Sequence, residues 1–173
     1  LTSNMRAFTA LLLLGAASAQ VTHDARPFVR NRAFSDVDAY FSRLPSAAAG
    51  AVPPEVWALA QDPAGQYLQF ATNSSSLAIN LTLGSAALDM WHFPSSGCSG
   101  VDLYAFDEQA REWRWLATPR PAYPFTAATL FDARESAAAR GASRFRVHLP
   151  TYNAVGSVTL TVDAGAYLTA DDS

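Results

Sequence analysis

The sequence predicts an all-β protein, an antiparallel β-sandwich of jelly-roll type with one short helix near its N-terminus. Three observations favour this class. Apolar residues recur at every second position in several short runs, which is the period of a half-buried strand. Clusters of Pro, Gly, Ser and Asn separate these runs. No helix-length periodic segment lies between them, which argues against alternating strands and helices.

The first residues have the pattern of a targeting segment. An apolar run at 7–14 follows a basic residue, and Ala17-Ser18-Ala19 fits the small-x-small site of signal peptidase. The apolar run is too short to span a bilayer, which takes about 20 helical residues. We therefore predict a signal peptide over residues 1–19, with 1–4 as upstream translation ahead of Met5, and a mature chain that starts near Gln20.

Two glycosylation acceptor patterns agree with export. They are Asn73-Ser74-Ser75 and Asn80-Leu81-Thr82, and the alternation places Asn80 on the polar face of its strand. The sequence therefore predicts a secreted protein with two acceptor sites.

The region that follows carries the predicted helix. Residues 20–35 have no apolar period and are expected to form a loose lead-in. Residues 36–44 predict a short helix capped by Ser35 or Asp36. Gly50 and the pair Pro53-Pro54 are expected to break any helix.

Beyond this point the period is two. In 77–83, four aliphatic residues alternate with Ala78, Asn80 and Thr82. The same alternation marks further strands at 68–70, 101–105, 113–115, 145–149 and 158–162. The stretch 101–117 predicts a hairpin with a charged loop at 107–111. The sandwich domain is placed at 36–165, and a linker is expected to start at 166–173.

Composition excludes several classes of function. Half of the 173 residues are hydrophobic and the formal net charge is -3, so nothing favours nucleic acid or an anionic membrane as partner. All twelve basic residues are arginine, which with the abundant alanine indicates coding bias from a GC-rich genome. The single cysteine, Cys98, excludes an internal disulfide and a zinc site built on thiolates. No metal and no cofactor is predicted.

No set of residues forms a recognisable catalytic centre. Gly97-Cys98-Ser99-Gly100 lacks the full G-x-S-x-G pattern and enters a strand rather than a helix, so we interpret it as a loop. His23, His92 and His148 are too far apart for a metal-binding pair, and His148 is expected on the solvent face of its strand. No catalytic residue is therefore assigned.

Aromatic residues leave two interpretations open. Trp91 and His92 precede the Gly-rich loop and could line a groove. Together with Tyr104, Trp113 and Trp115, Trp91 could form a platform on which sugar rings stack, although such residues also fill sandwich cores. A free-standing secreted carbohydrate-binding sandwich is therefore one functional hypothesis.

A family signature provides the other hypothesis. Gly100-Val101-Asp102-Leu103-Tyr104 resembles the G-x-D-L-Y motif of the N-terminal domain of SGNH hydrolase-type (GDSL-like) esterases. Further landmarks of that domain follow the same order at 42–45, 56–59, 90–104, 113–115 and 149–153. The resemblance covers roughly residues 36 to 165, almost the whole mature chain.

The resemblance implies a non-catalytic sandwich that precedes a separate α/β hydrolase domain in one polypeptide. In that family the catalytic serine lies in a Gly-x-Ser block early in the second domain, and its Asp and His partners lie late in it; none of these blocks occurs here. This chain is thus expected to be inert alone, with that domain as its partner. Asp102 is expected to hold the Gly97 to Gly100 loop by accepting backbone N–H bonds, with Tyr104 facing the core or the second domain.

Overall fold

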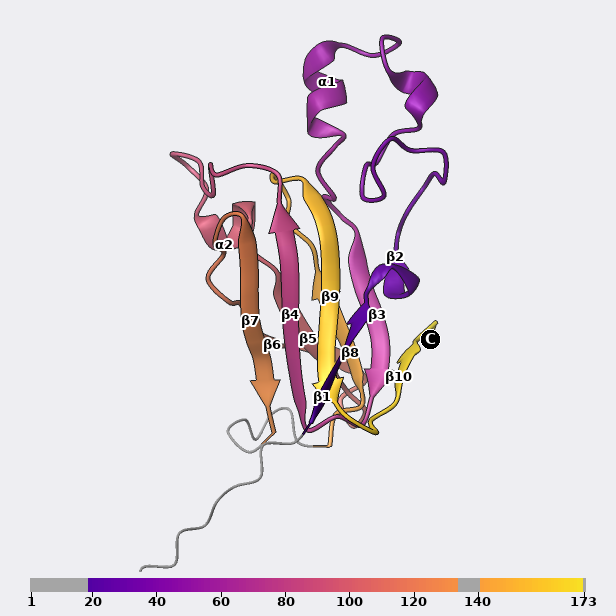
Figure 1. Cartoon of the computed structure of the whole chain (residues 1–173), viewed down its shortest axis with the longest axis vertical. Coiled ribbons are helices and arrows are strands. Elements are labelled where there is room, and N and C mark those ends of the chain that lie inside the picture. The colour runs from indigo at the N-terminus through magenta and orange to yellow at the C-terminus, as the bar shows by residue number, and fades with distance from the viewer. Residues whose placement is uncertain (1–18, 134–140, 173) are drawn as a thin grey trace, which may run out of the picture.

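Two antiparallel sheets pack face to face in the computed structural model, which describes residues 19–133 and 141–172 (Figure 1). The first sheet has the strand order β1 (Gln20–Asp24), β9 (Val155–Asp163), β4 (Ser76–Leu83) and β7 (Phe125–Asp132). The second has the order β10 (Leu168–Ala170), β3 (Tyr67–Thr72), β8 (Arg144–His148), β5 (Asp102–Asp107) and β6 (Glu112–Ala117), with β2 (Val29–Arg30) also on β3. The predicted antiparallel sandwich is confirmed.

Aromatic rings join the two sheets at the centre of the core. Phe145 of β8 stacks on Phe131 of β7 across the layers, with ring centroids 4.9 Å apart, and on Phe70 of β3 at 5.9 Å. Phe145 and its strand neighbour Val147 are fully buried. Because side chains alternate along a strand, burial of these two residues turns the rest of β8 to the outside.

Helices are short and lie outside the sheets. They are α1 (Pro54–Leu59), α2 (Ser95–Cys98) and the 3-10 turns Arg26–Phe28 and Ser46–Ala48. In Figure 1, α1 belongs to an excursion between β2 and β3 that stands beyond one end of the sandwich. Among the described residues, no helix combines the length and apolarity needed to cross a membrane.

The prediction of a helix at residues 36–44 is wrong. The chain there forms turns and bends, buries Phe41, and is held to the end of α1 by a hydrogen bond from the Arg43 N–H to the Ala60 carbonyl of 2.7 Å. The helix begins instead at Pro54, the residue expected to break one. Proline is well suited to a first helical position because its missing N–H has no helical acceptor there.

The sequence patterns did not predict four strands, β1, β2, β7 and β10, of which β2 is a two-residue pairing with β3. Residues 20–24 form the edge strand β1, paired with β9 over its whole length, rather than a loose lead-in. Strand β10 pairs with β3, so the sheets extend beyond the predicted range 36–165 at both ends. Strand β7 lacks a simple period because Thr126 points inward and a register shift opposite Leu77 interrupts its pairing with β4. Residues 1–18 of the predicted signal peptide lie outside the described residues.

The hairpin predicted at 101–117 is confirmed, with β5 paired to β6. Its loop is closed by Asp107, whose carboxylate accepts the N–H groups of Gln109 and Ala110 at 2.9 Å each. These backbone bonds, with help from Arg114, hold the pKa of Asp107 below its ordinary value.

The ring stack predicts a large loss of stability on truncation. Phe145→Ala should lower the free energy of unfolding by about 3–5 kcal/mol, because it removes a buried ring and leaves a cavity between the sheets. Trp91→Ala, at a position 97% exposed, should change it by less than about 0.5 kcal/mol. Urea denaturation followed by circular dichroism measures both, and equal effects would contradict this account of the core.

Candidate functional site: the outer face of the six-stranded sheet

The motif spans the two residues before β5 and the first three residues of β5, and its side chains divide between the core and the outer side of the sheet. Val101 and Leu103 are fully buried in the core, whereas Asp102 and Tyr104 are half-buried on the outer face of the sheet. Gly100 is required sterically, since a Cβ there would collide with the carbonyl oxygen of Ser96. The motif therefore combines one close backbone approach with the alternation of a strand. Of the two orientations expected for Tyr104, the one toward the core is excluded.

The expected role of Asp102 differs from the one found. Its carboxylate accepts the hydroxyl of Thr118, which in turn accepts the indole N–H of Trp115 at 2.9 Å. The preceding loop is held by its own helical turn, where the N–H groups of Gly97 and Cys98 donate to Pro94. Asp102 therefore ties the start of β5 to the end of β6 and does not pin the loop.

Polar and aromatic side chains cover the outer face in rows across the strands. In one row Tyr67, His148 and Asp102 are register partners. The next row brings together Gln69, Arg146, Tyr104 and Trp115. Phe106 and Trp113 pair on the same face, with a ring distance of 5.2 Å. We call this set, with Arg144, the outer face. Trp113 and Trp115 lie on it and therefore do not fill the sandwich core, which was one of their two interpretations.

Arg146 lies at the centre of the outer face. Its guanidinium carbon is 4.5 Å from the ring centre of Tyr67 and 4.3 Å from that of Trp113. Its Nε and Nη2 donate to Oε1 of Gln69 at 3.0 and 2.6 Å. The guanidinium of Arg146 thus lies over two rings, Tyr67 and Trp113. Each cation–π pair of this kind stabilises a folded protein by about 0.5–2 kcal/mol.

Arg144 has an equivalent place one step along the strand. Its guanidinium carbon lies 4.3 Å from the ring centre of Phe106, and its Nε donates to the carboxylate of Asp171 at 2.9 Å. The side chains of Arg144 and Asp171 are only 20% and 10% exposed. The alternation in Arg144–His148 predicts that both arginines share the solvent face of the strand with His148, but it does not indicate their contacts with aromatic rings.

His148 packs between two tyrosines on the half-buried part of this face. Its ring centre is 5.6 Å from that of Tyr67 and 5.5 Å from that of Tyr104. Burial lowers the pKa of His148, and the nearby charge of Arg146 lowers it further, while the carboxylate of Asp102 acts in the opposite direction. The imidazole therefore favours its neutral form more than a free histidine does.

The predicted groove residues lie at the tip of a tight turn instead. Met90 and Phe93 form an isolated bridge with reciprocal backbone bonds of 2.9 and 3.0 Å, and Trp91 and His92 project between them. Trp91 is 97% exposed and contacts only the ring of His92, at 4.7 Å, among the aromatic contacts found. The turn is held from below by Phe93, which packs edge-on against Tyr152.

The Gly-rich loop offers no accessible nucleophile. Ser99 is completely buried, and its Oγ accepts an N–H of the Asn153 side chain at 3.0 Å. The same side chain exchanges two hydrogen bonds of 3.0 Å with the backbone of Ser85, so Asn153 ties three loops together. Cys98 is buried as well.

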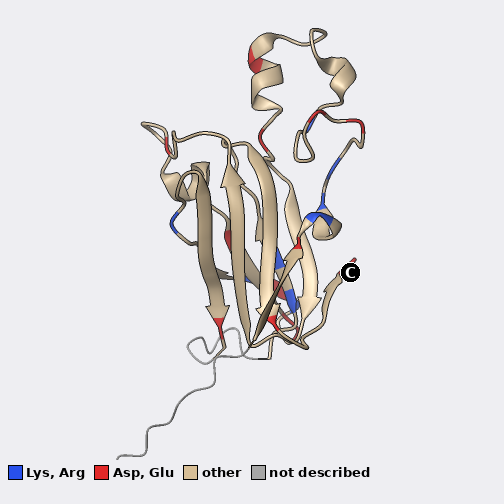
Figure 2. Cartoon of the chain, in the orientation of Figure 1, with Lys and Arg blue, Asp and Glu red and all other residues tan. Residues whose placement is uncertain are grey.

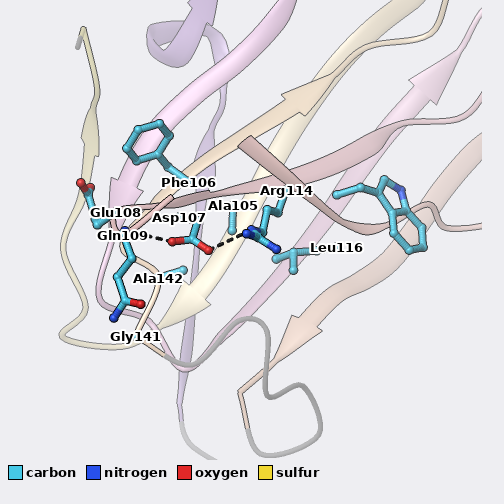
Figure 3. A pocket seen from close by; sticks show the side chains of 10 residues that line it. Ala105, Phe106, Asp107, Glu108, Gln109, Arg114, Leu116, Gly141 and Ala142 are labelled. Carbon is cyan, nitrogen blue, oxygen red and sulfur yellow. Dashed lines mark hydrogen bonds and ion pairs between the residues drawn. The ribbon is translucent and has the colours of Figure 1, made fainter. Parts of the chain in front are cut away.

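A cavity of about 830 Å³ lies at the other end of the β5–β6 hairpin (Figure 3). Its charged side chains are already paired, Asp107 with Arg114 at 2.8 Å and Glu108 with Arg144 at 3.5 Å. Of the residues singled out in the sequence as a site or platform, only Trp115 lines it. We assign no chemistry to it.

The remaining predicted positions are scattered. Asn80 is exposed on the outer side of the four-stranded sheet, and the exposed Asn73 accepts the N–H of Tyr167 at 3.0 Å. His23 lies on the edge strand β1. Within residues 19–133 and 141–172, no three His, Cys, Asp or Glu side chains come close enough together to hold a metal ion.

The fold is a two-layer antiparallel sandwich. Of the motif residues, Gly100 permits a close backbone approach, Val101 and Leu103 fill the core, and Asp102 and Tyr104 belong to the outer face. Residues 19–168 match the GxDLY family, described as the N-terminus of esterases of SGNH hydrolase type, and the chain belongs to this family. The resemblance seen in the sequence is thus confirmed. No curated protein matches the chain.

Two solved structures share the fold. A protein from Bacteroides ovatus described as a GDSL-like lipase superposes with a TM-score of 0.73 at 21% identity, over 89% of this chain and 44% of its own. The salicylyl-acyltransferase SsfX3 of a tetracycline biosynthetic pathway gives a TM-score of 0.57 at 19% identity, over 91% of this chain and 43% of its own. The chain therefore spans less than half the length of either relative.

The contacts of His148 predict two opposite pKa changes. Asp102→Asn should lower the pKa of His148 further, because it removes an attractive charge, and Arg146→Gln should raise it, because it removes a repulsive one. In the unaltered protein the free energy of unfolding should fall as the pH drops below about 6.5, since the unfolded chain takes up the proton first. NMR titration of the imidazole measures the pKa, and shifts of the same sign in both variants would contradict this geometry.

Proposed function

We propose that this chain is the non-catalytic N-terminal domain of a secreted esterase of SGNH hydrolase type. The observation that carries the proposal is the family match, which extends over residues 19–168 and belongs to the N-terminal part of such esterases. More than half of each structural relative lies beyond the part that this chain matches. The proposed reaction, serine-dependent ester hydrolysis, takes place in a following hydrolase domain.

In this proposal the domain acts by packing against the hydrolase domain or by helping to orient its substrate. An acetylated carbohydrate is the substrate class we favour, and deacetylation is the reaction. The domain would contribute surface and rigidity rather than reacting groups, because its serine and cysteine in the Gly-rich loop are buried.

Export is part of the proposal. It is supported by the signal-peptide pattern at 1–19 and by the acceptor asparagines Asn73 and Asn80, which are both exposed. A glycan at Asn80 would lie on the solvent side of the four-stranded sheet, across the sandwich from the outer face defined above, and one at Asn73 would lie in the loop between β3 and β4.

A second function is favoured by one observation. Trp91 and Trp115 expose 97% and 58% of their surface, and exposed indole rings are suited to stacking on sugars. The alternative is a free-standing carbohydrate-binding module. Against it, the ring faces of Tyr67, Phe106 and Trp113 are covered by guanidinium groups, which leaves no continuous platform.

The first function predicts what the transcript encodes. Read past Ser173, it should continue into a domain on the order of 200 residues with an early Gly-x-Ser block and a late Asp-x-x-His. Residues 20–173 alone should hydrolyse p-nitrophenyl acetate no faster than buffer does, whereas the longer product should hydrolyse it. A stop codon directly after Ser173 would contradict the proposal.

The two functions differ in what the isolated chain binds. As an accessory domain it should show no change in tryptophan fluorescence with acetylated xylo-oligosaccharides at millimolar concentration. Saturable quenching that Trp91→Ala or Trp115→Ala abolishes, with the Phe125→Ala variant unaffected, would instead establish the carbohydrate-binding module.

A further inference from the structure

The two sheets present very different outer surfaces. Along β9, β4 and β7 the four-stranded sheet exposes mainly small uncharged residues, with Phe125 at the start of β7 and Asp163 and Asp132 at strand ends. Figure 2 shows few charged residues on these strands. The six-stranded sheet carries Trp, Tyr, Phe and Arg side chains instead. These are the residue types that dominate the centres of protein interfaces.

The outer face is already ordered. Arg146 lies between the rings of Tyr67 and Trp113 and donates twice to Gln69, which is itself 5% exposed. An arginine on a solvated surface is usually mobile, and immobilising one on binding costs about 0.5–1.5 kcal/mol. Here intramolecular contacts hold it before any partner arrives, so the surface is preorganised for binding.

The same contacts favour a protein over a sugar as the occupant. Stacking on a pyranose needs an open ring face, and a guanidinium group lies over one face of Tyr67, of Phe106 and of Trp113. The accessible part of this face consists of half-buried rings and arginine side chains, with Trp115 as its most exposed ring at 58%. Such a surface complements carbonyl, carboxylate and apolar groups of another protein surface.

The position of the last described residues indicates which protein binds the outer face. Strand β10 pairs with β3, and Asp171 then bonds Arg144 and Gln69, both members of the rows on this face. Asp172 forms an ion pair of 2.5 Å with Arg30. The polypeptide therefore leaves the sandwich beside the outer face, and residues that follow start next to it.

We propose that the outer face, centred on Arg146 and extending to Trp115, is the surface on which the following SGNH hydrolase domain docks. This inference rests on the proposed function, because it needs that domain in the same polypeptide. It adds the place of contact and predicts that the uncharged side of the four-stranded sheet stays open to solvent.

Hydroxyl-radical footprinting tests the proposal on the longer product and on the 173-residue chain. Oxidation of Trp115 and Tyr104 should be several-fold slower in the longer product, while Phe125 should be oxidised at the same rate in both. Phe125 is a matched reference, since it is an aromatic residue on the edge strand of the other sheet and is 57% exposed.

A pair of charge substitutions completes the test. Arg146→Glu combined with Trp115→Glu should restore the fast oxidation of Tyr104 in the longer product and separate its thermal unfolding into two calorimetric transitions. Phe125→Glu should leave the protection and the single transition unchanged. Circular dichroism of the 173-residue chain with the paired substitutions verifies that the sandwich still folds; if it does not, Trp115→Glu alone replaces the pair.

Several outcomes would overturn the inference. In the longer product, these are protection of Phe125 from oxidation in place of Trp115, or no protection on either sheet. In the 173-residue chain, protection of Trp115 that rises with protein concentration would indicate a second copy as the occupant. Each of these leaves the proposed function standing if the longer product hydrolyses esters. A transcript that ends at Ser173 instead removes the proposed function itself.

Discussion

The stacking of Phe145 on Phe131 joins the two sheets, Phe70 packs on the same ring from within the six-stranded sheet, and the surface chemistry of the protein depends on this packing. A strand that buries one set of side chains must turn the alternate set outward. The core contact of Phe145 thus fixes Arg144 and Arg146 on the opposite side, where each reaches an aromatic ring of a neighbouring strand. The alternation of side chains along β8 therefore determines both the packing of the core and the order of the outer face.

The family signature is accounted for by structure rather than by reactivity. Gly100 permits a close backbone approach, and the two apolar motif positions fill the core. Asp102 connects through Thr118 to Trp115, which links the first residue of β5 to the end of β6. A motif made in this way marks a scaffold, and it is consistent with a domain whose partner performs the chemistry.

The outer face combines features that are seldom found on a solvated sheet. Gln69 and Asp171 are largely buried although they lie on the side away from the core, because arginine side chains and rings cover them. Ordered arginines with ring contacts give a surface of defined shape and charge. The opposite sheet surface has neither, so the sandwich is strongly asymmetric in what it offers another molecule (Figure 2).

The sequence alone determined the fold class, because the alternation in segments such as 77–83 has the period of a strand in any context. It could not determine which side of a strand Trp113 and Trp115 occupy, since a period of two is the same on both faces. The edge strand β1 and the position of the helix also needed the tertiary structure. β1 is defined by its pairing with β9, a partner more than a hundred residues away, and the bond between Arg144 and Asp171 joins segments that only the folded chain brings together.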